Sequence, residues 1–479
     1  MMYSIEDVVQ LKVQVSSISI KRNNHVFKQA LAALALCLSA LSIGATLGIS
    51  ALMLPELSKE THMGIDEKYH SWIASVAPLT MIFGCVTAGA LQDVFGRKLV
   101  LMCLNIPFLL GWILLGLSWN TETLILARIL TGFCSGALRP TGMVFLGEIT
   151  QPKYRGITLF SQATGANIGI LLNHLLGYGF AWRNNAFMAC LPLIFSSICL
   201  LFLRESPLWL ISKGKIDQGI KNFYWYRGGS EISQRELNAA LDKHSKGPPM
   251  PNAREMLILA FSKAFWMPFS TVTLLFSVAY YSGVNAMSFY AQDILKRTFG
   301  GDVNSFLLMI ITDVVRTSST VSMFVFGKCI PRRKAFFCSS FGTITLLMVL
   351  ILLLHFESTD LLWASVASLI LYMGTAGTLP SLSWSFVAEL FPTNLRGIGS
   401  GAGAAMSSFL LFTTVQISPI IMDTLGIKAM YGIFASVTCI CAVLLCCLLP
   451  DTNGKTLQEI EDNYNHDNDK NIEAPVFKL

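Results

Sequence analysis

The stretch Glu389-Leu-Phe-Pro-Thr-Asn-Leu-Arg396-Gly397 links two long apolar runs and gives the clearest indication of the fold. An earlier stretch, Glu148-Ile-Thr-Gln-Pro-Lys-Tyr-Arg155-Gly156, has the same layout, with an acid before an Arg-Gly pair at identical spacing. Related charged links that recur at a long interval between apolar runs indicate an internal duplication. The sequence therefore predicts two related halves.

The overall composition is that of a membrane protein. The 479 residues are 53% hydrophobic and only 13% charged, and their mean hydropathy is +0.56. A soluble domain could not cover its surface with so few charges. The first apolar run, at 29–54, is long enough to span a bilayer and follows a polar segment, so we expect a membrane helix rather than a cleaved signal peptide.

The apolar runs predict twelve membrane helices, six on each side of a polar segment at 204–263. They lie at 29–54, 71–92, 99–118, 123–147, 157–180, 184–203, 265–291, 303–327, 335–356, 361–387, 397–422 and 427–449. The predicted fold class is an all-α polytopic membrane protein with two pseudo-symmetric six-helix bundles. The expected units are an N-terminal segment at 1–28, bundles at 29–203 and 264–450, a linker with short helices at 204–263 and a tail at 451–479.

The distribution of positive charge predicts the orientation. Most of the 35 Lys and Arg residues fall in segments that share one side of the membrane with both chain ends. This bias remains when the 204–263 segment is left out. Because Lys and Arg are retained on the cytoplasmic side, we expect both termini in the cytoplasm.

Two further motifs close the predicted halves, Arg204-Glu-Ser-Pro-Leu-Trp-Leu210 and Pro450-Asp-Thr-Asn-Gly-Lys-Thr-Leu457. With the charged links, they make residues 29–461 resemble the sugar porters of the major facilitator superfamily, which include insect trehalose and hexose facilitators. The resemblance implies a plasma-membrane protein that moves a sugar through one central site by alternating access. It also implies function as a monomer, without a cofactor or nucleic acid.

Charged residues at the predicted inner helix ends are candidates for a gate. Ion pairs there can form when the inner mouth closes and break when it opens, but each exposed pair contributes only about 0–1 kcal/mol, so a network is needed. The same charges are also explained as topology signals and helix caps. The resemblance implies a gating role for Asp93, Arg97, Glu148, Arg155, Arg204 and Glu205 beneath the first half, and for Arg332, Arg333, Glu389, Arg396 and Asp451 beneath the second.

Sugar recognition needs amide and hydroxyl groups together with an aromatic face. Ser282-Gly-Val-Asn285-Ala286 resembles the helix 7 motif of the family, which implies that Asn285 contacts the ligand and Tyr290 forms an outer gate. Trp384 matches a tryptophan at the floor of the family's cavity, and Gln162 lies one position from its helix 5 glutamine. Such residues also serve as packing or hydrogen-bonding groups between membrane helices.

Several sugar-contact positions of the family are replaced, which leaves the substrate open. The replacements are Ala163, Ala279, Tyr280, Ser407 and Ser408. One alternative is a transporter of another small solute, with Asp313, Arg316, Tyr280 and Tyr281 as ligands. The other is a non-transporting sugar sensor, although sensors usually carry a longer tail.

Charges within the predicted spans are expensive and need partners. Asp313 and Arg316 are three residues apart on one helix face and can neutralise each other, either as a structural pair or as part of the cavity lining. Arg128 matches a family arginine, and Arg139 is expected to snorkel towards the membrane surface.

The first predicted helix contains no Asp or Glu between Lys28 and Pro55. Proton-driven symporters that resemble this chain keep an acid there, so its absence favours a uniporter. The chain also shows no metal-ligand spacing, nucleotide loop or nucleophile constellation, and an enzyme is therefore not expected.

Overall fold

The computed structural model describes residues 25–59, 69–246, 263–326, 330–356, 359–391 and 396–449, and these residues form helices and short links without a strand. The first half contains α2 (His25–Leu57), α3 (His70–Phe95), α4 (Arg97–Gly116), α5 (Thr121–Ile149), α6 (Pro152–Leu176), α7 (Trp182–Met188) and α8 (Cys190–Leu201). The linker contains α9 (Pro207–Ser212), α10 (Ile216–Arg227) and α11 (Glu231–Lys246).

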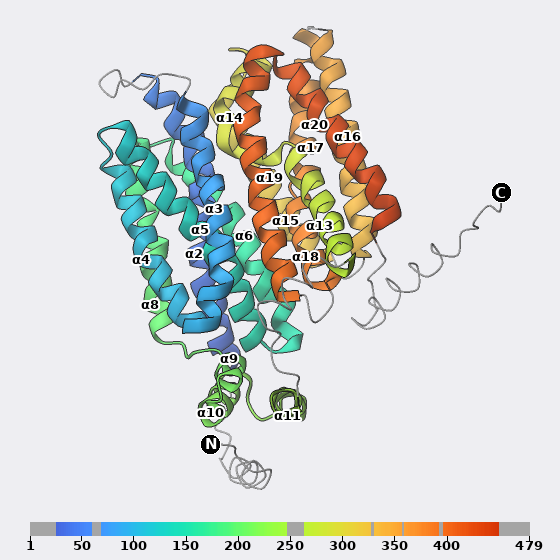
Figure 1. Cartoon of the computed structure of the whole chain (residues 1–479). Helices are drawn as coiled ribbons and strands as arrows, with labels where there is room; N and C mark the ends of the chain where they lie inside the picture. Colours follow the sequence, from blue (N-terminus) through green and yellow to red (C-terminus); the bar gives the residue numbers. More distant parts are fainter. Residues whose placement is uncertain are drawn as a thin grey trace, which may run out of the picture.

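The second half follows the same plan and lies beside the first (Figure 1). It contains α13 (Lys263–Tyr281), α14 (Val284–Phe299), α15 (Ser305–Phe326), α16 (Arg332–His355), the short η3 (Thr359–Leu361), α17 (Leu362–Ala376), α18 (Leu379–Leu390), α19 (Arg396–Thr424) and α20 (Ile427–Leu448). The two bundles meet mainly along three helix pairs, α3 with α19, α2 with α14 and α6 with α15. These six helices therefore form most of the interface between the halves.

Eleven segments of the described chain are long and apolar enough to cross a membrane. The predicted fifth span is not among them, although α6 has 25 residues, because it carries Gln162, Asn173 and His174 as buried polar side chains. A membrane helix tolerates such groups where neighbouring helices can hydrogen-bond them. Because α6 packs along α2 in one bundle and α15 in the other, its polarity is enclosed by protein. The chain is a multi-pass membrane protein with the predicted twelve-span architecture.

The seventh predicted span is broken in two. Gly283 separates α13 from α14 with φ +85°, a left-handed conformation that glycine adopts without steric cost. A Cβ at this position would also lie only 2.6 Å from the Tyr372 hydroxyl. Tyr290, with φ −130° and ψ 24°, adds a kink within α14. The break puts Asn285 in the first turn of a new helix.

The first bundle is held together by close backbone approach between α2 and α6. A Cβ added at Gly44 would lie 2.0 Å from the Ala166 carbonyl oxygen, and one at Gly169 would lie 2.1 Å from that of Leu41. Small residues permit this approach, which supplies the packing attraction that holds helices together in lipid.

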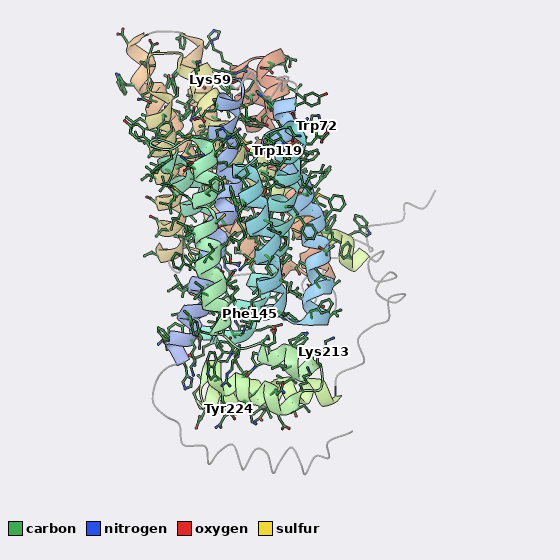
Figure 2. The ribbon with its side chains drawn as sticks, turned by 90° about the vertical axis from the view of Figure 1, so that its left-hand side faces the viewer. Lys59, Trp72, Trp119, Phe145, Lys213 and Tyr224 are labelled. Atoms are coloured by element: carbon green, nitrogen blue, oxygen red, sulfur yellow. The ribbon has the colours of Figure 1, made fainter. Side chains whose placement is uncertain are left out.

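The short linker helices lie at one end of the molecule only (Figure 2). Lys59, Trp72 and Trp119 lie towards one end, whereas Tyr224 of α10 and Lys213, which follows α9, lie at the other. We call these the opposite end and the linker end. Trp72 and Trp119 are 47% and 65% exposed, as expected for tryptophans at a membrane–water boundary.

Candidate transport site and gate

Gln162 of α6 is buried against α5. A Cβ added at Gly142 would lie 2.1 Å from its Nε2 atom, so a larger residue at that position would displace the amide. The Gln162 side chain is 4% exposed, and its Oε1 atom accepts no hydrogen bond from any described residue. The site therefore contains a buried acceptor without a partner.

Trp384 of α18 faces the same helix from the other half. Its ring packs edge-on against Phe276, with centroids 4.9 Å apart, and the Arg139 guanidinium of α5 lies 5.6 Å from its centroid. Arg139 thus points at an aromatic ring of the other half, and the expectation that it snorkels to the membrane surface was wrong. The buried Nε1 atom of Trp384 lies near the Tyr280 hydroxyl but makes no hydrogen bond of standard geometry with a described residue.

Gln162 and Trp384 are placed at one level of the molecule by α5. Gly142 lies against Gln162 and Arg139 lies against Trp384, and these two α5 residues are three positions and so about 4.5 Å apart along the helix axis. An amide from the first half and an indole from the second half therefore lie against neighbouring turns of α5.

Asn285 and Tyr290 both lie on α14. The Nδ2 atom of Asn285 is buried and donates no hydrogen bond to a described residue. The Tyr290 hydroxyl donates to the Val415 carbonyl oxygen at 3.1 Å, which fixes the kinked turn of α14 against α19. Asn285 thus offers a free donor, whereas the Tyr290 hydroxyl is already used within the second half.

The replaced family positions form an apolar and hydroxyl-bearing surface. Tyr280 is 5% exposed and its ring centroid lies 5.9 Å from that of Phe276. Ser407 and Ser408 donate to the Ala404 carbonyl oxygen of their own helix at 2.8 and 3.1 Å. Their hydroxyls keep acceptor capacity for a neighbour.

The intramembrane charges form a network that includes a residue not predicted from sequence. Asp313 pairs with Arg316 at 3.2 Å, and its other carboxylate oxygen contacts Nδ1 of His174 on α6. Arg316 also donates to the Ser288 hydroxyl at 2.5 Å. His174 is fully buried, and its Nε2 atom lies 3.1 Å from the Gly48 carbonyl oxygen. The only sequence signal for it was a histidine within a predicted membrane span.

Arg128 is hydrogen-bonded by neutral groups and forms no ion pair with a carboxylate of the described residues. Its guanidinium donates to the carbonyl oxygens of Thr46, Ile73 and Ala74 at 2.9, 3.2 and 3.2 Å, and to the Ser50 hydroxyl at 3.1 Å. Carbonyl and hydroxyl dipoles thus occupy the place where the resemblance leads one to look for an acid. These bonds tie α5 to both α2 and α3.

The gate candidates of the first half meet at the linker end. Arg97 pairs with Asp93 at 3.2 Å and with Glu148 at 3.0 Å, and Glu148 also accepts a hydrogen bond from the Ser206 hydroxyl. Glu205 accepts from the backbone N–H of Arg97 at 2.9 Å. All of these contacts lie within the first half and its linker.

The remaining candidates of the first half do not join this network. The Arg204 guanidinium lies 5.0 Å from the ring centroid of Trp225, and Nε of Arg155 is buried without a hydrogen-bond partner among the described residues. The sequence predicted that both belong to the cluster. In the structure, neither Arg155 nor Arg204 forms an ion pair with an acid of the described residues.

Two gate candidates of the second half lie in the first turn of α16. Arg332 begins α16, and Arg333 donates to the Cys446 carbonyl oxygen at 3.0 Å. Asp451 lies outside the described residues, and so do the side chains of Glu389 and Arg396.

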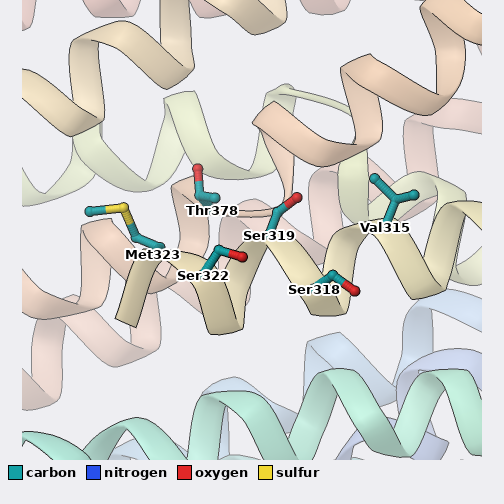
Figure 3. Close-up of a pocket in the computed structure, with 6 residues that line it drawn as sticks. All are labelled: Val315, Ser318, Ser319, Ser322, Met323 and Thr378. Carbon is teal, nitrogen blue, oxygen red and sulfur yellow. The ribbon is translucent and has the colours of Figure 1, made fainter. Parts of the chain in front are cut away.

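A hydroxyl-rich hollow of about 430 Å³ follows one face of α15 (Figure 3). It is lined by Val315, Ser318, Ser319, Ser322, Met323 and Thr378. The hollow runs along α15 between the level of Arg316 and the linker end. Sequence reasoning did not single out these serines, because hydroxyl side chains are common on buried faces of membrane helices.

Contacts between the two halves are numerous towards the opposite end. Ser75 of α3 donates to Gln416 of α19 at 2.5 Å, and the rings of Trp72 and Phe412 lie 6.5 Å apart. Deeper in the molecule, Asn167 of α6 donates to Thr320 of α15 at 3.1 Å. These contacts join the two halves towards the opposite end.

The family model for "Sugar (and other) transporter" matches residues 26–464. The chain is 28% identical over 450 residues to the facilitated trehalose transporter Tret1 of Apis mellifera ligustica, covering 91% of this chain and 88% of the relative. It is 27% identical over 446 residues to the Tret1 of Bombyx mori, with 91% and 86% covered.

Solved structures give the same fold. The proton:xylose symporter XylE of the major facilitator superfamily, bound to 6-bromo-6-deoxy-D-glucose, matches with a TM-score of 0.78 at 18% identity, over 92% of this chain and 100% of that one. The inward-open xylose transporter XylE from E. coli matches with a TM-score of 0.73 at 17% identity, over 90% and 98%. With the family model matching nearly the whole chain, this protein belongs to the sugar (and other) transporter family, a family of transporters, and it has the fold of the major facilitator superfamily structure XylE.

Proposed function

We propose that this protein is a facilitative transporter that carries a sugar, such as trehalose or a hexose, across a membrane by alternating access. One observation carries the proposal. Gln162 Oε1, Asn285 Nδ2 and Trp384 Nε1 are buried polar atoms without hydrogen-bond partners among the described residues. Leaving such a group unsatisfied costs about 1–3 kcal/mol, which a ligand with many hydroxyl groups would recover.

The aromatic side chains support the same ligand class. Trp384 offers a ring to the C–H face of a sugar, and Phe276 holds that ring edge-on. Gln162 and Asn285 then supply one acceptor and one donor from different halves. A solute bound to both halves is positioned to couple binding to their relative movement.

Uniport is supported by the surroundings of Arg128. The α2 helix places carbonyl and hydroxyl groups, not a carboxylate, against this guanidinium. Without a titratable acid there, the proton step that the family's symporters place on the first helix has no carrier. We propose that the solute gradient alone sets the direction of flux.

The proposed cycle moves the two bundles, 29–203 and 264–450, about the central site. The linker end would face the cytoplasm with both termini, and the protein would function as a monomer in the plasma membrane. Positive charge on the linker side supports this orientation. The gate at that end would use the Arg97 network of the first half together with its counterparts in the second.

The decisive test is uptake of radiolabelled trehalose and glucose into proteoliposomes, with and without a pH gradient. Saturable uptake of either sugar, with no accumulation driven by the pH gradient, supports the proposal. Accumulation that requires the pH gradient would overturn uniport, and no flux of any sugar would overturn the substrate class. Empty liposomes and protein carrying Asn285→Ala serve as controls.

A second candidate is transport of an anionic small solute. Arg316 favours it, because its Nε atom is buried without a hydrogen-bond partner among the described residues and its ion pair uses only one edge of the guanidinium. Competition of sugar uptake by small carboxylates distinguishes the two ligand classes. Inhibition that is lost in Arg316→Gln would favour the anion.

A further inference from the structure

His174 connects the two halves through a charged contact. It lies on α6 of the first half, whereas Asp313 and Arg316 lie on α15 of the second. Its Nδ1 atom contacts one carboxylate oxygen of Asp313, and its Nε2 atom lies 3.1 Å from the Gly48 carbonyl oxygen of α2. The ring therefore sits between a carbonyl of one half and a carboxylate of the other.

The hydrogen-bond partners determine how many protons this site holds. A carbonyl oxygen can only accept, so Nε2 must carry the hydrogen that is donated to Gly48. In neutral imidazole the other nitrogen, Nδ1, would then present a lone pair to a carboxylate oxygen, which also only accepts. The contact is satisfied only when one further proton lies between His174 and Asp313.

Arg316 decides which of the two groups carries that proton. It pairs with the second carboxylate oxygen of Asp313 at 3.2 Å, and a nearby cation favours the ionised carboxylate. The proton therefore resides on His174, which donates from both nitrogens.

We propose that His174 is a proton-dependent latch between the halves: with the proton bound it closes the opposite end against Asp313, and without it the halves part there. The proposal rests on the alternating-access function proposed above. It adds a control of that cycle by pH, and it does not require the proton to cross the membrane with the solute. A proton returned to the side from which it came changes the rate of exchange but drives no accumulation.

No other titratable group near the latch can take over this role within the described structure. From α5, Arg128 is already bonded to backbone carbonyls. From α14, Tyr290 donates to the Val415 carbonyl oxygen, and from α17, Tyr372 donates to that of Ser282. The α2 helix contributes the Gly48 carbonyl oxygen. Each of these donors is hydrogen-bonded to another carbonyl oxygen. The extra proton of the contact must therefore be bound by His174 or Asp313.

The sign of the pH effect follows from where the proton is bound. The closed arrangement holds one proton more than the open one, so lowering the pH favours closure and raising it favours opening. For a single proton, the ratio of closed to open molecules changes by at most tenfold for each pH unit. Neutral contacts between the halves, such as that of Asn167 with Thr320, should not respond.

The latch can be tested without transport by measuring distances across the opposite end. Spin labels on unnatural amino acids at Trp119 and Asp360, both exposed, report the separation of the halves by pulsed electron paramagnetic resonance. We expect the short-distance population to grow as the pH falls from 8 to 5.5. In His174→Gln the amide can donate to Asp313 without a proton, so the distances should no longer depend on pH.

His355→Gln is the matched control, because His355 is an exposed histidine at the end of α16. It should keep the parent's pH response. A parent without a pH response, or a response that survives in His174→Gln, would overturn the latch. If His174→Gln fails to fold, ¹⁵N spectra of the histidine-labelled parent decide instead. The most buried ring should show both nitrogens protonated at neutral pH, and a fully neutral set of rings would overturn the latch.

Uptake at equal pH on both sides keeps this test separate from that of the proposed function. A pH-dependent distance without any sugar uptake would uphold the latch and reject the transported substrate. Sugar uptake together with pH-independent distances would uphold the transported substrate and reject the latch.

Discussion

Glu205 of the linker accepts a hydrogen bond from the backbone N–H of Arg97, the first residue of α4, at 2.9 Å. The same oxygen accepts from Lys98 at 2.9 Å, so one carboxylate caps the start of a membrane helix from a distant part of the chain. Gly96, with φ +99°, permits this approach, because a Cβ there would lie 2.6 Å from the carboxylate. The linker is thereby fastened to the end of the first bundle.

Replacing Glu205 should destabilise this junction. Glu205→Ala removes a cap that also carries negative charge at a helix N-terminus, and we expect a loss of about 1–2 kcal/mol in unfolding free energy. Glu205→Gln keeps an oxygen acceptor and should lose less. Thermal unfolding in detergent measures both. Glu231→Ala, at an exposed acid of α11, is the control and should stay near the parent.

Gly142→Ala should weaken sugar binding through Gln162. The added methyl group would occupy the position of the Gln162 amide, and loss of one ligand hydrogen bond should raise the half-saturation concentration by about 3–10-fold. Gly147→Ala on the same helix is the control, since nothing lies within 4 Å of its Cβ position. Equal half-saturation concentrations for both variants would remove Gln162 from the site.

Trp384→Ala should lower affinity while leaving the fold intact. The ring supplies the aromatic face of the proposed site, and its removal should weaken binding by about 1–2 kcal/mol, or roughly 5–30-fold. Trp384→Phe should recover part of this. Binding is measured by tracer displacement, and Trp363→Ala, at a position that is 71% exposed, controls for the loss of an indole. Unchanged affinity in Trp384→Ala would show that the ring does not contact the solute.

Tyr226→Phe should loosen the linker from the first bundle. The Tyr226 hydroxyl donates to the Arg204 carbonyl oxygen at 2.6 Å and accepts from its backbone N–H at 3.0 Å. Losing both bonds in a buried place should cost about 1–3 kcal/mol. Protease cleavage within the linker should accelerate in the variant, and an unchanged cleavage rate would contradict the assignment.

The same tyrosine gives a pH prediction. Burial raises the pKa of Tyr226 well above the usual range for a phenol. The folded protein therefore keeps a proton that the unfolded chain loses above about pH 10, so stability should fall as the pH rises past that point. Tyr226→Phe should show a smaller alkaline decline than the parent. Unfolding midpoints between pH 8 and pH 11 measure the difference.

The sequence was sufficient for the architecture because membrane spans are long and their composition is extreme. The repeated Glu-to-Arg-Gly spacing predicted the two halves, and the apolar runs predicted the spans. It was less informative about α6, whose buried polar residues are satisfied by neighbours that no local pattern identifies. The break at Gly283 was also missed, since a single glycine within an apolar run is common in membrane helices.

The candidate site was predictable only in part. Gln162, Asn285 and Trp384 were chosen by resemblance, and their roles remain predictions. His174 was missed because its importance comes from Asp313, which belongs to the other half and is 139 residues away. Contacts across such separations depend on how helices pack in three dimensions, and a single sequence does not contain that information.

The carbonyl cage around Arg128 has a mechanical consequence. The Arg128 guanidinium of α5 is hydrogen-bonded to the backbones of α2 and α3. If these helices slid past one another, the bonds would break and leave a buried cation without partners. The first half should therefore move as a rigid body during the cycle. Bending during the cycle would then fall on the second half, at the glycine hinge between α13 and α14.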